Sequence, residues 1–148
     1  MSQPANAQLF FDAAVAAGAT VIKPVEKSLW GIGGLVQAPD GAIWNIATSN
    51  KKDSGPAARE IEEFVLLLGV DDVKASRKFY EQLGLTVGKS FGSFLDFDLG
   101  DSPVGLGLYK RAALAKSASV SPDGDGSHRI RIIGDVGAAT DPDGFVWE

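Results

Sequence analysis

The sequence predicts an α+β fold that is built from two related βαβββ units. The first observation is a repeat, because "APDGAIWN" at 38–45 returns as "DPDGFVWE" at 141–148. Pro, Asp and Gly in this order are typical of a tight turn, and the apolar residues after them indicate a strand, so each copy predicts a hairpin. The second observation is order: 61–110 predicts strand–helix–strand–strand–strand, and 6–48 predicts the same order without its first strand. A repeated hairpin in a repeated order indicates a repeated module.

The N-terminal half begins with a predicted helix over 6–17, followed by Gly18 as its stop signal. Its apolar residues recur at helical spacing: they are Leu9, Phe10, Ala13, Ala14 and Ala17. Three short β-type runs follow at 20–25, 31–37 and 42–47, and the first P-D-G turn joins the last two. These residues therefore predict the second, third and fourth strands of a module.

The C-terminal half opens with a nearly continuous apolar run at 62–70, which predicts a buried strand. Asp72 is a good N-cap for a helix that ends before Gly84. Three further β-type runs complete the module, and an alternating run follows the loop after them. These four runs are 85–91, 94–100, 104–110 and 128–133. We expect the last run to supply the strand that the N-terminal unit lacks.

We interpret the chain as one domain over 1–148, which is long enough to form a core without disulfides. Its predicted parts follow the order of the runs above. They are an αβββ half-module at 6–48, a polar linker at 49–60, a βαβββ module at 61–110, a loop with a short helical turn at 111–127, and closing strands at 128–148.

Composition excludes several classes of protein. The formal charge of −5 offers no basic surface, so we expect neither nucleic acid nor membrane as a partner. The chain has no cysteine, which excludes disulfides, thiolate metal sites and a cysteine nucleophile. No apolar stretch reaches membrane length, and the first residues, "MSQPANAQ", do not look like a signal peptide. We expect a soluble, cytoplasmic protein.

Two stretches resemble the vicinal oxygen chelate superfamily, which includes glyoxalases, bleomycin-resistance proteins and extradiol dioxygenases. "VLLLGVDDVKASRKFYEQLGLTVGKSF" at 65–91 resembles the first strand, helix and second strand of such a module. "AAVAAGATVIKPVEKSLWGIGGLVQAPDGAIWNIA" at 13–47 resembles the later part of the other module. The resemblance implies paired βαβββ modules whose curled mixed sheets enclose a ligand cavity. The order of the modules is permuted here, because the module that normally comes last leads.

The resemblance also implies where a metal would bind. Active members hold a divalent metal through His, Gln or Glu side chains, and these positions fall here on Val65, Gly107, Asn45 and His128, the chain's single histidine. Two of the four have no donor side chain, so we expect no cofactor. The alternative is a divalent metal held by His128 with Glu148, which occupies the glutamate position of the second phrase. The simpler interpretation makes Glu148 a solvated residue and His128 a cap after the loop.

Five residues are candidates for ligand binding: Trp30, Asn45, Gly107, Tyr109 and His128. In relatives the segment of Trp30 lies near the cavity mouth. Gly107 would leave room over one face of its strand, and Tyr109 would offer an aromatic surface with a hydroxyl. Cross-strand packing explains the Gly107 and Tyr109 pattern equally well.

Two other tryptophans are expected in the core. Neighbouring residues of a strand point to opposite faces. If Asn45 and Glu148 face the cavity, Trp44 and Trp147 face the helices.

The function that we expect is metal-free binding of a small molecule, in the manner of the bleomycin-resistance proteins. The ligand would be an antibiotic or other xenobiotic, aromatic or cationic, and the protein would sequester it without catalysis. The alternative is a metal-dependent, glyoxalase-like lyase or isomerase whose site is completed across a dimer. A third hypothesis is a remnant that folds and oligomerises without a ligand. We expect a homodimer, with or without exchanged strands, because incomplete modules leave open strand edges.

Overall fold

The structure is a computed structural model, and it describes residues 1–124, 128 and 130–148. The chain forms two compact units, residues 1–63 and residues 64–148. The predicted α+β class is confirmed, because each unit packs at least one helix on a β-sheet. No helix in the described part of the chain is long and apolar enough to cross a membrane.

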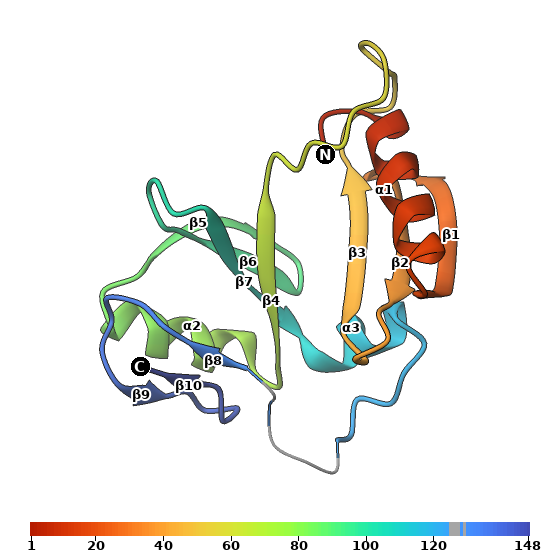
Figure 1. Ribbon diagram of the computed structural model, residues 1–148. Coiled ribbons are helices and arrows are strands. Elements are labelled where there is room, and N and C mark those ends of the chain that lie inside the picture. Colours follow the sequence, from red (N-terminus) through yellow and green to blue (C-terminus); the bar gives the residue numbers. More distant parts are fainter. Residues whose placement is uncertain (125–127, 129) are drawn as a thin grey trace. The chain divides into compact units, whose positions relative to one another are not determined.

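The first unit is a helix on a three-stranded antiparallel sheet (Figure 1). Its elements are α1 (Pro4–Ala16), β1 (Thr20–Ser28), β2 (Gly31–Gln37) and β3 (Ile43–Thr48), and the strand order is β1-β2-β3. The helix begins two residues before the predicted start, because proline fits the first turn of a helix, where no N–H donor is needed. As predicted, the unit has the parts of a module without its first strand.

The core of the first unit lies between α1 and one face of this sheet. Ala7 and Phe11 of α1 are buried against Val36 of β2 and Ile46 of β3. Gly34 makes this close packing feasible, because a Cβ atom there would lie 2.7 Å from Cε2 of Phe11. Even-numbered residues of β2 and β3 therefore face the helix, and odd-numbered ones face away from it.

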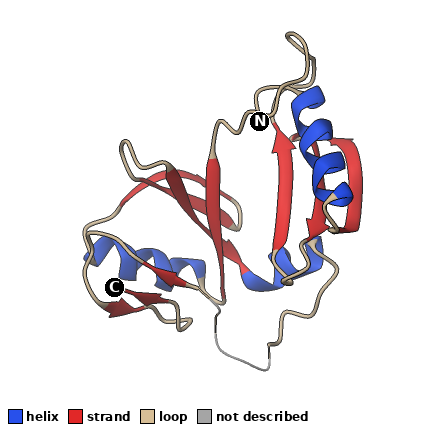
Figure 2. Ribbon diagram, in the orientation of Figure 1, coloured by secondary structure: helices blue, strands red, loops and turns tan. Residues whose placement is uncertain are grey.

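The segment that we interpreted as a linker is bonded to α1. The side-chain oxygen of Gln3 accepts hydrogen bonds from the N–H groups of Ser54 (2.7 Å) and Gly55 (3.0 Å). The side-chain oxygen of Asn6 accepts one from the N–H of Ala58, at 2.7 Å. Because Gln3 and Asn6 are buried, these bonds hold the long loop between β3 and β4 (Figure 2) in place.

The second unit contains the complete module. Its elements are β4 (Phe64–Val70), α2 (Val73–Gln82), β5 (Thr86–Phe91), β6 (Phe94–Asp98) and β7 (Val104–Lys110). The strand order is β4-β7-β6-β5, with β4 parallel to β7 and the other pairs antiparallel. The predicted βαβββ order is therefore confirmed.

The chain continues with α3 (Arg111–Ser117), β8 (Arg131–Ile132), β9 (Ala139–Thr140) and β10 (Val146–Trp147). The three short strands form a small sheet in the order β8-β10-β9, with β8 parallel to β10. Within the second unit, β8 of the predicted run 128–133 thus pairs with β10, which is much nearer in sequence than the N-terminal sheet, so that closing the loop costs less entropy. Residues 125–127 of the predicted loop lie outside the described residues.

Helix α2 lies between the four-stranded sheet and the small sheet (Figure 1). Tyr80 of α2 is fully buried, and its ring centroid lies 5.3 Å from that of Phe97 and 5.8 Å from that of Trp147. The closing strands are therefore part of the core of the second unit.

Both copies of the repeated phrase form the predicted hairpin. The N–H of Ala38 donates to the carbonyl of Ala42 at 2.8 Å, and the N–H of Asp141 donates to the carbonyl of Phe145 at 3.0 Å. The glycine of each turn has a positive φ, 92° in the first and 89° in the second. The first turn joins β2 to β3, and the second joins β9 to β10.

Candidate functional site

The site that we consider is a hollow in the first unit, on the side of the sheet away from α1. Its volume is about 350 Å³. Two of the predicted ligand-binding residues, Trp30 and Asn45, line it together. The complete lining is Lys23, Pro24, Glu26, Lys27, Ser28, Trp30, Gly31, Ile32, Gly33, Gly34, Leu35, Asn45, Ala47 and Thr48.

Strand register explains which side chains reach this hollow. Asn45 pairs with Leu35, and Ala47 pairs with Gly33, so these four residues share the face opposite α1. The amide of Asn45 is exposed there and supplies both hydrogen-bond donors and an acceptor. Its strand neighbour Trp44 lies on the α1 side, as predicted, although its side chain is still 45% exposed rather than buried.

Gly33 forms the floor of the hollow. A Cβ atom at this position would lie 2.7 Å from the Cβ of Ala47 and 2.9 Å from the carbonyl oxygen of Ile46. Any larger residue would therefore push β2 away from β3 or fill the hollow. A glycine here leaves the backbone open to close approach by a ligand.

Trp30 stands at the tip of the hairpin that joins β1 to β2. The hydroxyl of Ser28 accepts a hydrogen bond from the N–H of Trp30 at 3.1 Å and donates one to the carbonyl of Gly31 at 3.2 Å. These bonds fix the backbone of the tip, while the indole itself remains 70% exposed. The hollow is thus rimmed by a large aromatic surface on a defined turn.

Both signs of charge occur beside the aromatic ring. Lys23 pairs in register with Leu35, and Glu26 pairs with Gly33, so an ammonium and a carboxylate lie on the same open face. Both side chains are exposed. The local charge of the hollow is therefore mixed, although the whole chain is acidic.

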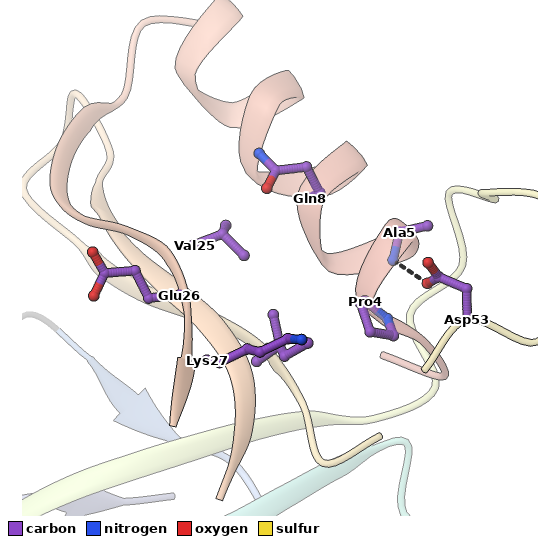
Figure 3. A pocket seen from close by; sticks show the side chains of 8 residues that line it. Pro4, Ala5, Gln8, Val25, Glu26, Lys27 and Asp53 are labelled. Carbon is purple, nitrogen blue, oxygen red and sulfur yellow. Dashed lines mark hydrogen bonds between the residues drawn. The ribbon is translucent and has the colours of Figure 1, made fainter. Parts of the chain in front are cut away.

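A second hollow, of about 330 Å³, lies on the α1 side of the same sheet (Figure 3). It is formed between the first turn of α1 and the end of β1, and it contains none of the predicted site residues. Its lining is Pro4, Ala5, Gln8, Val25, Glu26, Lys27, Ile32 and Asp53. The carboxylate of Asp53 already accepts a hydrogen bond from the N–H of Ala5, at 2.7 Å, so it caps the helix rather than facing a ligand.

Gly107 and Tyr109 lie in the second unit, on the face of β7 that points away from α2. The space beside Gly107 is occupied, because a Cβ atom there would lie 2.8 Å from Cδ2 of Leu67 and 3.1 Å from Cε2 of Phe94. The rings of Phe94 and Tyr109 lie 6.2 Å apart. Cross-strand packing, the alternative that we left open, accounts for the Gly107 position.

His128 is held by the turn of the closing hairpin. Its ring stacks on Phe145 with centroids 3.7 Å apart, and its Nε2 lies 2.9 Å from the carbonyl oxygen of Asp143. Glu148 forms an ion pair with Arg131. His128 thus interacts with Asp143 and Phe145, whereas Glu148 interacts with Arg131.

The side chains at the implied metal positions do not fit a divalent cation. Val65 and Gly107 offer no donor atom, and Asn45 offers a neutral amide. Within the described residues, no three His, Cys, Asp or Glu side chains gather in one place. The donor set of this chain therefore differs in kind from that of a catalytic metal site.

A buried polar network in the second unit was not predicted. The hydroxyl of Tyr80 donates to Oδ2 of Asp141 at 2.7 Å and accepts a hydrogen bond from Nε1 of Trp147 at 3.3 Å. Oδ1 of Asp141 accepts from the N–H groups of Asp143 and Phe145. Burial is the main cause that raises the pKa of the Tyr80 phenol. The sequence held one signal for this network: the second phrase begins with Asp141, whereas the first begins with Ala38.

Comparison with known proteins gives a match only at the level of structure. No protein-family model and no curated protein sequence matches the chain. It is similar to a V278E mutant of glyoxalase I from Zea mays, with 14% identity, 95% of this chain and 62% of that chain covered, and a TM-score of 0.54. It is also similar to a glyoxalase/bleomycin resistance protein/dioxygenase from Nocardioides, with 26% identity, 52% and 50% coverage, and a TM-score of 0.38.

The likeness to the maize protein shows that this chain has a glyoxalase-type fold. The resemblance seen in the sequence is confirmed as far as the fold is concerned. The chain spans 62% and 50% of the lengths of these two proteins.

Proposed function

We propose that this chain, on its glyoxalase-type fold, binds a small and partly aromatic organic molecule in the hollow of the first unit, without a metal and without catalysis. One observation carries the proposal: Trp30 from the β1–β2 turn and Asn45 from β3 line the same hollow of about 350 Å³. An apolar wall with a few convergent polar groups is the usual make-up of a ligand site.

The lining favours a flat ligand of one or two rings. Trp30, which is 70% exposed, offers an aromatic side chain for stacking, and an aromatic pair contributes about 0.5–1.5 kcal/mol beyond the buried area. The amide of Asn45 can orient a polar substituent, and Gly33 lets the ring approach the backbone. The volume falls at the lower end of ligand sites, which span roughly 300–1,000 Å³.

The competing function is a metal-dependent lyase or isomerase with a site completed across a dimer. It would require His128 to turn away from Asp143 and Phe145, and Glu148 to leave Arg131. It would also require further ligands, because Val65 and Gly107 provide none. The donor set therefore supports binding over metal catalysis.

A thermal-shift screen tests the proposal. The library contains aromatic and cationic antibiotics and other small xenobiotics, and it is run with and without a chelator. A ligand at 100 times its Kd stabilises the folded state by about 2.7 kcal/mol. For a chain of this size, that corresponds to a rise in Tm of roughly 5–11 °C.

Paired variants locate the site of any hit. Trp30→Ala should abolish the shift, whereas Trp44→Phe, on the other face of the same sheet, should keep it. A hit that Trp30→Ala binds as tightly as the wild type would place the ligand elsewhere. A shift that appears only with added Ni, Zn, Mn or Fe would favour the metal-dependent alternative.

A further inference from the structure

The second hollow of the first unit, between α1 and the end of β1, has no role in the proposed binding of an aromatic ligand (Figure 3). Its volume is about 330 Å³, close to the 350 Å³ of the first hollow. Glu26, Lys27 and Ile32 line both hollows, since these lie on the two faces of the same β1–β2 hairpin. The two hollows are similar in size but differ in the other side chains that reach them.

The floor of the second hollow is aliphatic. Ile32 is only 8% exposed, and Val25 packs against the core that α1 forms with the sheet. Pro4 and Ala5 of α1 form the opposite wall. Among the described residues that line this hollow, none is aromatic, whereas Trp30 lines the first one. A short aliphatic chain is therefore a better match for this floor than a flat ring.

Strand register brings one cation to this hollow. Lys27 pairs with Ile32, which lies on the face of β2 toward α1, so Lys27 lies on that face too. Glu26, one residue earlier, lies on the opposite face. Figure 3 agrees, because Lys27 points toward α1 and Glu26 points away from it. Lys27 forms no ion pair with another residue in the described part of the chain.

The other polar groups of the second hollow already have partners. The carboxylate of Asp53 accepts the N–H of Ala5 at 2.7 Å, where the positive end of the α1 dipole stabilises its charge. The side-chain amide of Gln8 donates to Oδ1 of Asp12 at 2.8 Å. The ammonium of Lys27 is thus the group of this hollow that can hold the charged end of a ligand, and that end must be an anion.

We propose that the second hollow binds a short aliphatic carboxylate, with its chain on Val25 and Ile32 and its carboxylate beside Lys27. A volume at the lower end of ligand sites limits the chain to about four to six carbon atoms. Because Lys27 is exposed and the buried chain is short, the Kd is on the order of 1 mM. This site is additional to the proposed function and does not depend on it.

Amide chemical shifts of ¹⁵N-labelled protein test the proposal and locate the ligand. Sodium hexanoate is the probe, and it is titrated to about ten times the expected Kd. Ala5 and Gln8 line only the second hollow, and Asn45 and Ala47 line only the first. Hexanoate should shift the amide signals of Ala5 and Gln8 to saturation. The proposal fails if these shifts do not saturate, or if those of Asn45 and Ala47 are as large.

Paired lysine variants test the role of the charge. Lys27→Gln removes the ammonium of an exposed residue, so the fold should stay intact and hexanoate should bind roughly threefold more weakly. Lys23→Gln is the matched control, because Lys23 is exposed on the same strand, pairs with Leu35 and lines only the first hollow. It should keep the wild-type affinity. Unchanged affinity in Lys27→Gln, or equal losses in both variants, would overturn the proposal.

Two analogues of the probe test the class of ligand. Hexanamide, which has no charge, should bind the wild type about as weakly as hexanoate binds Lys27→Gln, and added salt should weaken only hexanoate, because salt screens an exposed charge. 6-Aminohexanoate carries an ammonium at its other end and should bind no more tightly than hexanoate, since Asp53 is engaged by α1. Tighter binding of 6-aminohexanoate, or hexanoate binding that salt leaves unchanged, would contradict the assignment to simple carboxylates.

Discussion

The hydrogen bond between Tyr80 and Asp141 should contribute more to the stability of the second unit than any surface contact. Tyr80 is fully buried, Asp141 is 4% exposed, and the bond is 2.7 Å long. Tyr80→Phe removes the hydroxyl donor, so that Oδ2 of the buried Asp141 loses this hydrogen bond. It also deprives the indole N–H of Trp147 of its acceptor.

The expected cost follows from the charge on the acceptor. A hydrogen bond to a charged group contributes about 1.5–3 kcal/mol, so Tyr80→Phe should lower the free energy of unfolding by about 2 kcal/mol. With a urea m-value of roughly 1.5 kcal/mol/M, the unfolding midpoint falls by roughly 1.3 M. Trp147, in contact with Tyr80, provides a fluorescence signal for this transition.

Tyr109→Phe is the matched control, because Tyr109 is the other tyrosine of the chain and lies on the face of β7 that points away from α2. Loss of the Tyr109 hydroxyl should change the free energy of unfolding by less than about 0.5 kcal/mol. Equal midpoints for wild type and Tyr80→Phe, or equal losses in both variants, would refute the role that we assign to the buried bond.

Four further outcomes are expected. Because burial raises the pKa of Tyr80 above the unfolded value of about 10, the advantage of the wild type over Tyr80→Phe should be full below pH 10 and shrink above it, as measured by urea unfolding at pH 8 and pH 11. Asp72→Ala should cost about 1 kcal/mol, because the carboxylate of Asp72 accepts two N–H bonds at the start of α2; an unchanged midpoint would contradict this. Gln3→Ala should make 50–60 the first site of limited proteolysis, with Gln8→Ala as the resistant control. Gly33→Val should abolish ligand binding and destabilise the first unit by about 1–3 kcal/mol, so a variant that retains both affinity and stability would exclude Gly33 as the floor.

The parts of the fold that were predictable are those determined by local chemistry. Both P-D-G turns, the cap at Asp72 and the helix stops at glycine depend on a few neighbouring residues, and the structure contains all of them. The first turn joins β2 to β3 inside the N-terminal module, whereas the second joins β9 to β10 in the small sheet that follows the complete module.

The parts that were not predictable depend on distant contacts. We predicted a linker at 49–60 from its polar composition. Nothing in that composition reveals that the buried side chains of Gln3 and Asn6 bond to the backbone of this segment. The pairing of β8 with β10 was not predicted, because two nearly identical phrases offered two acceptor strands. At Gly107, a glycine pattern fits a cavity and packing equally well, and only the structure shows that the side chains of Leu67 and Phe94 lie close to it.

The measurement that tests the central claim most directly is a titration of the best screening hit into wild-type protein after chelation, with the metal content of the same sample measured by elemental analysis. Metal-free binding predicts one ligand per chain with an affinity that chelation leaves unchanged, and at least a tenfold weaker affinity in Trp30→Ala. Binding that vanishes on chelation and returns with about one metal per chain or per dimer would contradict the account, and it would direct attention to His128 and Glu148.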